Sequence, residues 1–87
     1  MRTLAIDYGG KRVGLAMSDE GGRYATPFDV IANDHALIPA IVALVRLEEV
    51  RRIIVGLPLN MDGTLGASAK PVLAFARLLE PLVGFAP

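Results

Sequence analysis

A single carboxylate, Asp7, interrupts the first apolar segment of the chain, Leu4-Ala5-Ile6-Asp7-Tyr8. A carboxylate among apolar neighbours is costly to bury unless a cation or hydrogen bonds satisfy it. Two kinds of partner meet that need. One is a divalent metal ion, with Asp7 as a ligand. The other is the chain itself, through the amides of the glycine turn that follows or through an ion pair with Lys11 or Arg12.

Two glycines and two basic residues follow this carboxylate closely, in the order Gly9-Gly10-Lys11-Arg12. Glycine permits a positive φ and a close approach of the backbone to another molecule. An arginine side chain also matches the oxygens of a phosphate. The same four residues are explained as well by a tight turn with a solvated basic corner. Phosphate binding and turn formation therefore both remain open here.

A second polar cluster lies later in the chain and follows the β-branched triplet Ile53-Ile54-Val55; it consists of Asn60, Asp62, Gly63 and Thr64. Taken singly, these are ordinary loop residues. The chain has one histidine, His35, and no cysteine. A Cys-based zinc site and a thiol nucleophile are thereby excluded, and His35 is interpreted as a helix-start residue rather than a ligand.

The 87 residues, of which 53% are hydrophobic, support one small core and no second domain. Nine basic and nine acidic residues cancel, so contact with nucleic acid has to come from a local patch. Asp7 interrupts the N-terminal apolar stretch too early for a signal peptide. No apolar run approaches the roughly 20 residues that span a bilayer. We therefore expect a soluble cytoplasmic protein without membrane association.

Apolar segments at residues 3–8 and 12–18, separated by the glycine turn, predict a β-hairpin. A third strand is expected over residues 24–31, and Pro27 indicates that it is an edge strand or is interrupted, because proline lacks the ladder donor. Asn33 and Asp34 are good capping residues for a helix that begins near Ala36 and carries Pro39 in its first turn.

After this helix, residues 48–52 form a polar break before Ile53-Ile54-Val55, which we interpret as a parallel strand buried on both faces. A second helix is expected from about residue 67 to 79, with Pro71 near its start and Pro81 ending it. The resulting order predicts an α/β fold with a mixed sheet. Asp7 and the loop after the fourth strand then lie at the same end of the sheet, where the parallel strands have their carboxyl ends. Asp19 and Glu20 lie at the opposite end.

The segments Asp7–Ala16 and Val55–Thr64 resemble the two N-terminal motifs of the YqgF family, also called RuvX, and this resemblance covers essentially the whole chain. It implies a ribonuclease H-like fold of order β-β-β-α-β-α. It also implies a nuclease dependent on Mg²⁺ or Mn²⁺ that acts on structured nucleic acid, either the 5′ end of pre-16S rRNA, Holliday junctions or both. By the same resemblance Asp7 is catalytic and a metal ligand, and four residues bind nucleic acid: Lys11, Arg12, Asn60 and Thr64.

The family continues into a fifth strand with an Asp-Glu-Arg motif and a helix with a further aspartate, whereas this chain stops before that strand. We therefore expect a single domain, residues 1–87, that is incomplete at its C-terminal end and inactive or nearly so alone. There are two other interpretations: a non-catalytic module that binds nucleic acid or a partner, and a piece of an actin-like or sugar-kinase ATPase. The loop Gly56-Leu57-Pro58-Leu59-Asn60 and a chain too short for a two-domain nucleotide cleft argue against the ATPase. An unpaired strand edge further predicts a homodimer, formed by edge pairing or by a swapped C-terminal helix.

Overall fold

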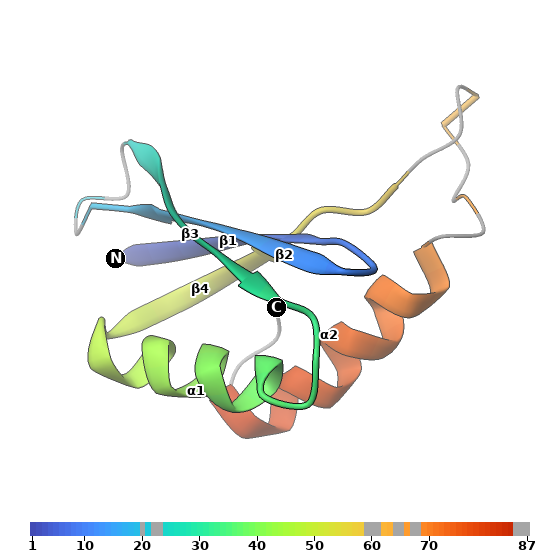
Figure 1. The fold of residues 1–87 in the computed structure, drawn as a ribbon. Coiled ribbons are helices and arrows are strands. Elements are labelled where there is room, and N and C mark those ends of the chain that lie inside the picture. Colours follow the sequence, from blue (N-terminus) through green and yellow to red (C-terminus); the bar gives the residue numbers. More distant parts are fainter. Residues whose placement is uncertain (20, 22–23, 59–61, 64–65, 67–68, 85–87) are drawn as a thin grey trace.

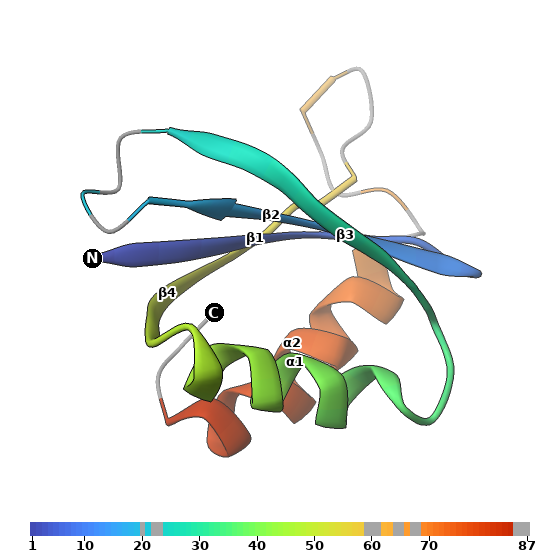
Figure 2. The ribbon, with the colours of Figure 1, turned by 60° about the vertical axis from the view of Figure 1, so that its left-hand side comes forward.

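The computed structural model describes residues 1–19, 21, 24–58, 62–63, 66 and 69–84, and the fold is given for these residues. The elements follow the order β1, β2, β3, α1, β4 and α2. The strands form one mixed sheet with the spatial order β3-β2-β1-β4, and both helices lie on the same side of it (Figures 1 and 2). The predicted order of elements and the mixed sheet are confirmed.

β1 (Arg2–Tyr8) and β2 (Arg12–Ser18) form the antiparallel hairpin expected from the glycine turn. Strand alternation sends Leu4 and Ile6 to the helix-covered face, where they are 0% and 2% exposed. It leaves Asp7 on the opposite face, which we call the open face. The turn requires Gly9, because a Cβ at this position would lie 2.4 Å from the carbonyl oxygen of Arg12.

β3 (Ala25–Ala32) pairs antiparallel with β2 and forms one edge of the sheet. The pairing shifts between Leu15 and Ala16, whose partners are Asp29 and Pro27. Phe28 is therefore the extra residue of a β-bulge. Proline lies in an edge strand, as predicted, because an edge strand leaves one side of its backbone without a ladder partner.

α1 (Leu37–Leu47) buries an apolar stripe formed by Leu37, Ile41 and Val45. Each side chain of this size contributes roughly 1.5–3 kcal/mol when it is fully buried. The helix begins one residue after the predicted start, and Pro39 lies in its first turn, where its missing N–H has no helical partner to lose. This part of the prediction is confirmed.

The expected capping of α1 is wrong in its details. The N-cap residue is Ala36, which forms no side-chain cap hydrogen bond. Asp34 uses Oδ1 to accept a hydrogen bond from the backbone N–H of Ala36 at 2.9 Å, just before the helix. Asn33 donates its side-chain amide to the carbonyl oxygen of Gly9, 2.7 Å away. The reason is tertiary, because the end of β3 lies beside the β1–β2 turn.

β4 (Val50–Val55) runs parallel to β1 and forms the other edge of the described sheet. Two corrections follow. The strand includes Arg51 and Arg52, so the predicted polar break is part of the strand, and both side chains are exposed. Ile53 is 3% exposed but Ile54 is 45% exposed. The strand is therefore buried on one face only, because both helices lie on that face.

α2 (Ala69–Val83) carries Pro71 near its start, as predicted, but Pro81 lies inside the helix and does not end it. The helix ends at Val83 and is followed by Gly84, which has a φ of 85° and donates its N–H to the carbonyl oxygen of Glu80 at 3.0 Å. A glycine in this left-handed conformation is a common helix terminator. The first predicted residues of the helix, 67 and 68, lie outside the described residues.

The core lies between the helix-covered face and the two helices, and strands and helices both contribute to it (Leu4, Ile6, Val13, Leu15, Met17, Leu37, Ile41, Val45, Val50, Ile53, Phe75 and Leu79). Within the part of the chain that the structure describes, no helix combines the length and the hydropathy that crossing a membrane requires. The open face carries no element of the described chain (Figure 2). The candidate site therefore has to be sought on this face and at its edges.

Candidate functional site

Asp7 is the penultimate residue of β1 and pairs directly with Gly14 of β2. A Cβ built on Gly14 would lie 3.7 Å from the Cβ of Asp7, so the glycine leaves room beside the carboxylate. The sequence predicted a carboxylate that burial forces to find a partner, and this is wrong because Asp7 is exposed. The open face is uncovered at this point, and water solvates the charge.

Neither intramolecular partner suggested for Asp7 is found among the described residues. Its carboxylate accepts no hydrogen bond from the glycine turn, and it forms no salt bridge within 4.0 Å of Lys11 or Arg12. The side chain is thus available to an external cation or ligand.

The ends of β1 and β4 meet beside Asp7, as predicted from their parallel order. The N–H of Gly56, directly after β4, donates to the carbonyl oxygen of Ile6 at 3.1 Å. A hollow of about 440 Å³ opens at this junction, and we call it the Asp7 hollow; its lining residues are Asp7, Tyr8, Gly10, Gly56, Leu57, Pro58, Pro71 and Val72. It brings together the ends of two strands and the first turn of α2.

Asp7 also borders a second, shallower depression on the open face, with a volume of about 640 Å³. Most of its lining is small or apolar (Ala5, Gly14, Ala16, Pro27, Phe28, Val30, Ile54 and Gly56). Three of these side chains are large and substantially exposed: Phe28 at 46%, Val30 at 63% and Ile54 at 45%. The carboxylate therefore borders both the Asp7 hollow and the apolar depression on the open face.

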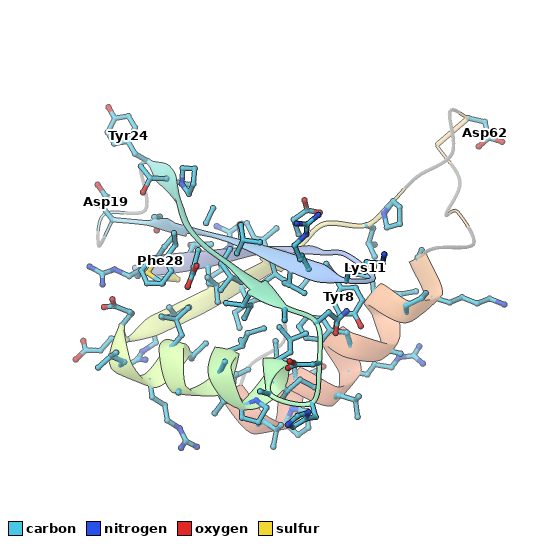
Figure 3. The ribbon with its side chains drawn as sticks, in the orientation of Figure 1. Tyr8, Lys11, Asp19, Tyr24, Phe28 and Asp62 are labelled. Atoms are coloured by element: carbon cyan, nitrogen blue, oxygen red, sulfur yellow. The ribbon has the colours of Figure 1, made fainter. Side chains whose placement is uncertain are left out.

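Lys11 and Arg12 are exposed at the β1–β2 turn, next to the Asp7 hollow. Figure 3 shows Tyr8 and Lys11 at the same end of the sheet, opposite Asp19 and Tyr24. Asn33, which directly follows β3, holds the turn. Its backbone N–H donates to the carbonyl oxygen of Lys11 at 2.9 Å, and its side chain donates to that of Gly9 at 2.7 Å.

Two residues that the sequence did not indicate as site residues, Tyr8 and Asn33, are therefore part of this site. Tyr8 lines the Asp7 hollow, and its ring centroid lies 4.7 Å from that of Phe75 in α2. An aromatic side chain at the end of a strand, directly after the candidate carboxylate, was the available signal for it. Asn33 carried no such signal, because its partner is 24 residues away in the chain.

The loop between β4 and α2 enters the site only in part. Asn60 and Thr64 lie outside the described residues. Asp62 is exposed and lies well away from Tyr8 and Lys11 in Figure 3. His35 is exposed and borders a separate hollow behind Tyr8. Asp19 lies at the opposite end of the sheet, as predicted, whereas Glu20 is not among the described residues.

The described residues do not by themselves supply a two-metal site. They contain no group of three or more His, Cys, Asp and Glu side chains that could hold a metal ion. A pair of cations needs several carboxylates to position it, and Asp7 is one. We therefore derive no catalytic step through a metal for these residues.

A family model described as "RuvX: Holliday junction resolvase" matches residues 1–86 of this chain. Three similar proteins are each named "Putative pre-16S rRNA nuclease". They come from Syntrophus aciditrophicus, at 40% identity, from Anaeromyxobacter sp. strain Fw109-5, at 44%, and from Moorella thermoacetica, at 43%. Each alignment covers 97% of this chain.

The chain spans 57%, 63% and 61% of the length of these three relatives, respectively.

Among solved structures, a Ppx/GppA phosphatase of Aquifex aeolicus matches with a TM-score of 0.47 and 15% identity, over 99% of this chain and 34% of that chain. We draw nothing from a likeness this weak. The family match agrees with the mixed four-stranded sheet and its two helices, which are consistent with a ribonuclease H-like fold. The chain therefore belongs to the RuvX family, whose model is described as Holliday junction resolvase.

Proposed function

We propose that the Asp7 end of the sheet is the substrate-cleaving edge of a nuclease that acts on structured nucleic acid. The observation that carries this proposal is the position of Asp7, an exposed carboxylate without a partner among the described residues, where the ends of β1 and β4 meet. Ligand sites of sheets with parallel strands favour this edge. The names of the relatives support pre-16S rRNA as a substrate, and the description of the family model supports Holliday junctions.

In this proposal Lys11 and Arg12 bind phosphate groups of the substrate, and Asn60 and Thr64 contact it from the loop after β4. The charge balance of the chain is even, so the local basic turn is what attracts a polyanion. Gly9 and Asn33 act by positioning this turn. The whole protein is proposed to work in the cytoplasm.

Mg²⁺ or Mn²⁺ is the proposed cofactor, with Asp7 as one ligand among others that the described residues do not include. Because one carboxylate does not organise two cations, residues 1–87 alone are expected to bind nucleic acid without cutting it. The second candidate function is a non-catalytic module that binds nucleic acid. The observation that favours it is that the described part of the chain contains no metal-binding cluster.

A chimaera separates the two functions. Residues 1–86 of this chain replace the matching part of the Syntrophus aciditrophicus relative, so that the protein reaches the relative's full length. We expect cleavage of a pre-16S rRNA or of a four-way DNA junction in Mg²⁺ or Mn²⁺, and loss of cleavage in the Asp7→Asn variant. Asp19→Asn, at the opposite end of the sheet, is the matched control and keeps activity. If the Asp7→Asn chimaera cuts as fast as its parent, the nuclease role of Asp7 is wrong.

We also propose that the chain forms a homodimer through β4. This strand is at the edge of the described sheet, and no described strand pairs with its outer side. An exposed apolar strand edge is a template for pairing with another chain. The alternative route is an exchange of α2 between two copies.

A further inference from the structure

The hollow behind Tyr8 adjoins the Asp7 hollow, and the two share Tyr8 and Pro71 as lining residues. We call it the His35 hollow; it has a volume of about 400 Å³ and is lined by Tyr8, Asn33, Asp34, His35, Leu37, Ile38, Pro71, Ala74, Phe75 and Leu78. Sites of about 300–1,000 Å³ accommodate small organic ligands. A molecule that reaches from Asp7 around the Tyr8 ring therefore enters the His35 hollow.

One wall of the His35 hollow is a fixed aromatic surface. The rings of Tyr8 and Phe75 lie 4.7 Å apart with an interplanar angle of 36°. Phe75 is 4% exposed and belongs to the core, so it holds the orientation of Tyr8, which remains partly exposed. A preorganised aromatic ring is a platform on which a nucleobase stacks, whatever the base.

The rim of the hollow is polar and is joined to the basic turn. Asn33, Asp34 and His35 follow β3 directly. Asn33 is bonded to the carbonyl oxygens of Gly9 and Lys11, so the rim and the turn that carries Lys11 form one unit. The rim of the hollow is therefore next to the turn that carries Lys11 and Arg12.

From this continuity we infer that the His35 hollow binds one unpaired nucleobase of the substrate, next to the strand that enters the Asp7 hollow. This inference rests on the proposed nuclease function and adds to it a preference for substrates with a single-stranded segment beside the cleaved bond. Stacking on Tyr8 and hydrogen bonding at the His35 rim provide the contacts.

The lining of the hollow favours a base over a phosphate group. Ile38, Ala74 and Leu78 form apolar walls, which suit a flat ring and leave a phosphate without donors. The carboxylate of Asp34 repels a phosphate but accepts hydrogen bonds from the exocyclic amino group of a base. The phosphate is better placed on Lys11 and Arg12, outside the hollow.

Tyrosine fluorescence tests the inference directly, because the chain has two tyrosines and no tryptophan. In the Tyr24→Phe variant, Tyr8 is the one remaining tyrosine, and Tyr24 is 73% exposed at the far end of the sheet, so its loss leaves the site intact. We expect adenosine 5′-monophosphate to quench this emission with a saturable dependence on concentration. Ribose 5-phosphate, which has the sugar and phosphate without the base, leaves the emission unchanged. Equal quenching by both compounds overturns the inference.

A second variant fills the hollow from α2 and leaves both aromatic residues, Tyr8 and Phe75, unsubstituted. Ala74 is exposed on the helix and lines the hollow, so Ala74→Leu obstructs it and preserves the helix. We expect the affinity for a short single-stranded RNA to fall roughly fivefold or more, as for the loss of one stacked base. Ala43→Leu is the matched control, since Ala43 is an exposed alanine of α1 that lines none of the three hollows described above. Equal affinities of the two variants contradict the inference.

The two proposals fail separately. If the chimaera cleaves and Asp7→Asn abolishes cleavage, but neither quenching nor the Ala74→Leu effect occurs, the nucleobase site is wrong and the nuclease function stands. If base binding is found and Asp7→Asn leaves cleavage unchanged, the hollow binds nucleotides for another purpose.

Discussion

Asn33 joins the end of β3 to the β1–β2 turn, since its side-chain amide donates a 2.7 Å hydrogen bond to the carbonyl oxygen of Gly9. The bond is partly buried and spans 24 residues of sequence. It makes one rigid corner out of the basic turn and the rim of the His35 hollow. Both proposed nucleic-acid contacts depend on that corner.

Replacement of Asn33 by alanine is expected to lower the free energy of unfolding by about 1 kcal/mol, the usual contribution of one intramolecular hydrogen bond. Urea denaturation monitored by circular dichroism measures this change. The backbone N–H of Asn33 still donates to Lys11 in the variant, so the fold persists while the turn loosens. Asn33→Asp keeps the shape of the side chain but also lacks the amide donor. It is therefore expected to be at least as unstable as Asn33→Ala, which separates the loss of the hydrogen bond from the loss of side-chain volume. If Asn33→Ala is as stable as the parent chain, the bond does not hold the turn.

Gly9 and Gly10 provide a paired test of the turn geometry. A Cβ on Gly9 would lie 2.4 Å from the Arg12 carbonyl oxygen, whereas a Cβ on Gly10 meets nothing within 4 Å. Gly9→Ala is therefore expected to lose roughly 1–3 kcal/mol of stability, as for other insertions into occupied space. Gly10→Ala should stay within about 0.5 kcal/mol of the parent, as for other surface substitutions. Thermal denaturation of both variants side by side decides the matter, and equal melting temperatures contradict the described turn.

The basic turn is expected to determine the salt dependence of nucleic-acid binding. Removing both charges in Lys11→Ala/Arg12→Ala should reduce the slope of log K against log salt by roughly 2, about one for each phosphate that the turn no longer neutralises. Fluorescence anisotropy with a labelled RNA, at several salt concentrations, measures the slope. Arg51→Ala/Arg52→Ala removes two exposed charges from β4 instead and is the matched control. A slope that changes equally in both double variants indicates a general charge effect and no phosphate site at the turn.

Glu49 lies between α1 and β4 with a φ of 54°, a left-handed conformation that is strained for a residue with a Cβ. Glu49→Gly removes this strain and is expected to raise the free energy of unfolding by about 0.5–1 kcal/mol, after allowing for the greater entropy of glycine in the unfolded chain. In a chain of this size the melting temperature then rises by roughly 2–8 °C. Glu48→Gly, one residue earlier, should be destabilising because Glu48 pairs with Arg2 at 3.2 Å. A melting temperature lowered by both substitutions contradicts this account.

Pairing through the edge of β4 predicts self-association that increases with concentration. The N–H of Gly56 points toward β1, and alternation along the regularly paired end of the strand therefore directs the N–H of Val55 outward. Val55→Pro removes that outer donor and should shift the chain toward the monomer. Val55→Ala keeps the N–H and should not. Multi-angle light scattering from low micromolar to millimolar concentration provides the measurement, and a parent chain that stays monomeric throughout rules out the dimer.

Much of the architecture was predictable because it depends on local signals. The glycine turn after Tyr8 and the alternation around it determined the hairpin, and Pro39 and Pro71 set the starts of both helices to within about two residues. Gly9 acts through its missing Cβ, and the two prolines act through their fixed φ and missing donor, which are properties of the residues themselves. The motif around Asp7 likewise identified the family before any geometry was known.

Features that depend on which elements pack beside a segment could not be predicted from the sequence. Pro81 was expected to end α2, yet the helix continues to Val83, and the N–H of Gly84 still bonds to the carbonyl oxygen of Glu80. Ile53-Ile54-Val55 was expected to be covered on both faces, but both helices pack on one.

The state of Asp7 shows this division most clearly. Its type and its place at the end of the first strand were evident from the sequence. Its exposure was not, because solvation depends on whether another element covers the open face. Asn33 is the converse case, since an ordinary loop residue became the support of the turn when folding brought β3 beside Gly9. Residue types and their spacing determine the turns, the strand alternation and the candidate carboxylate. Burial and long-range hydrogen bonds arise only when distant segments pack together.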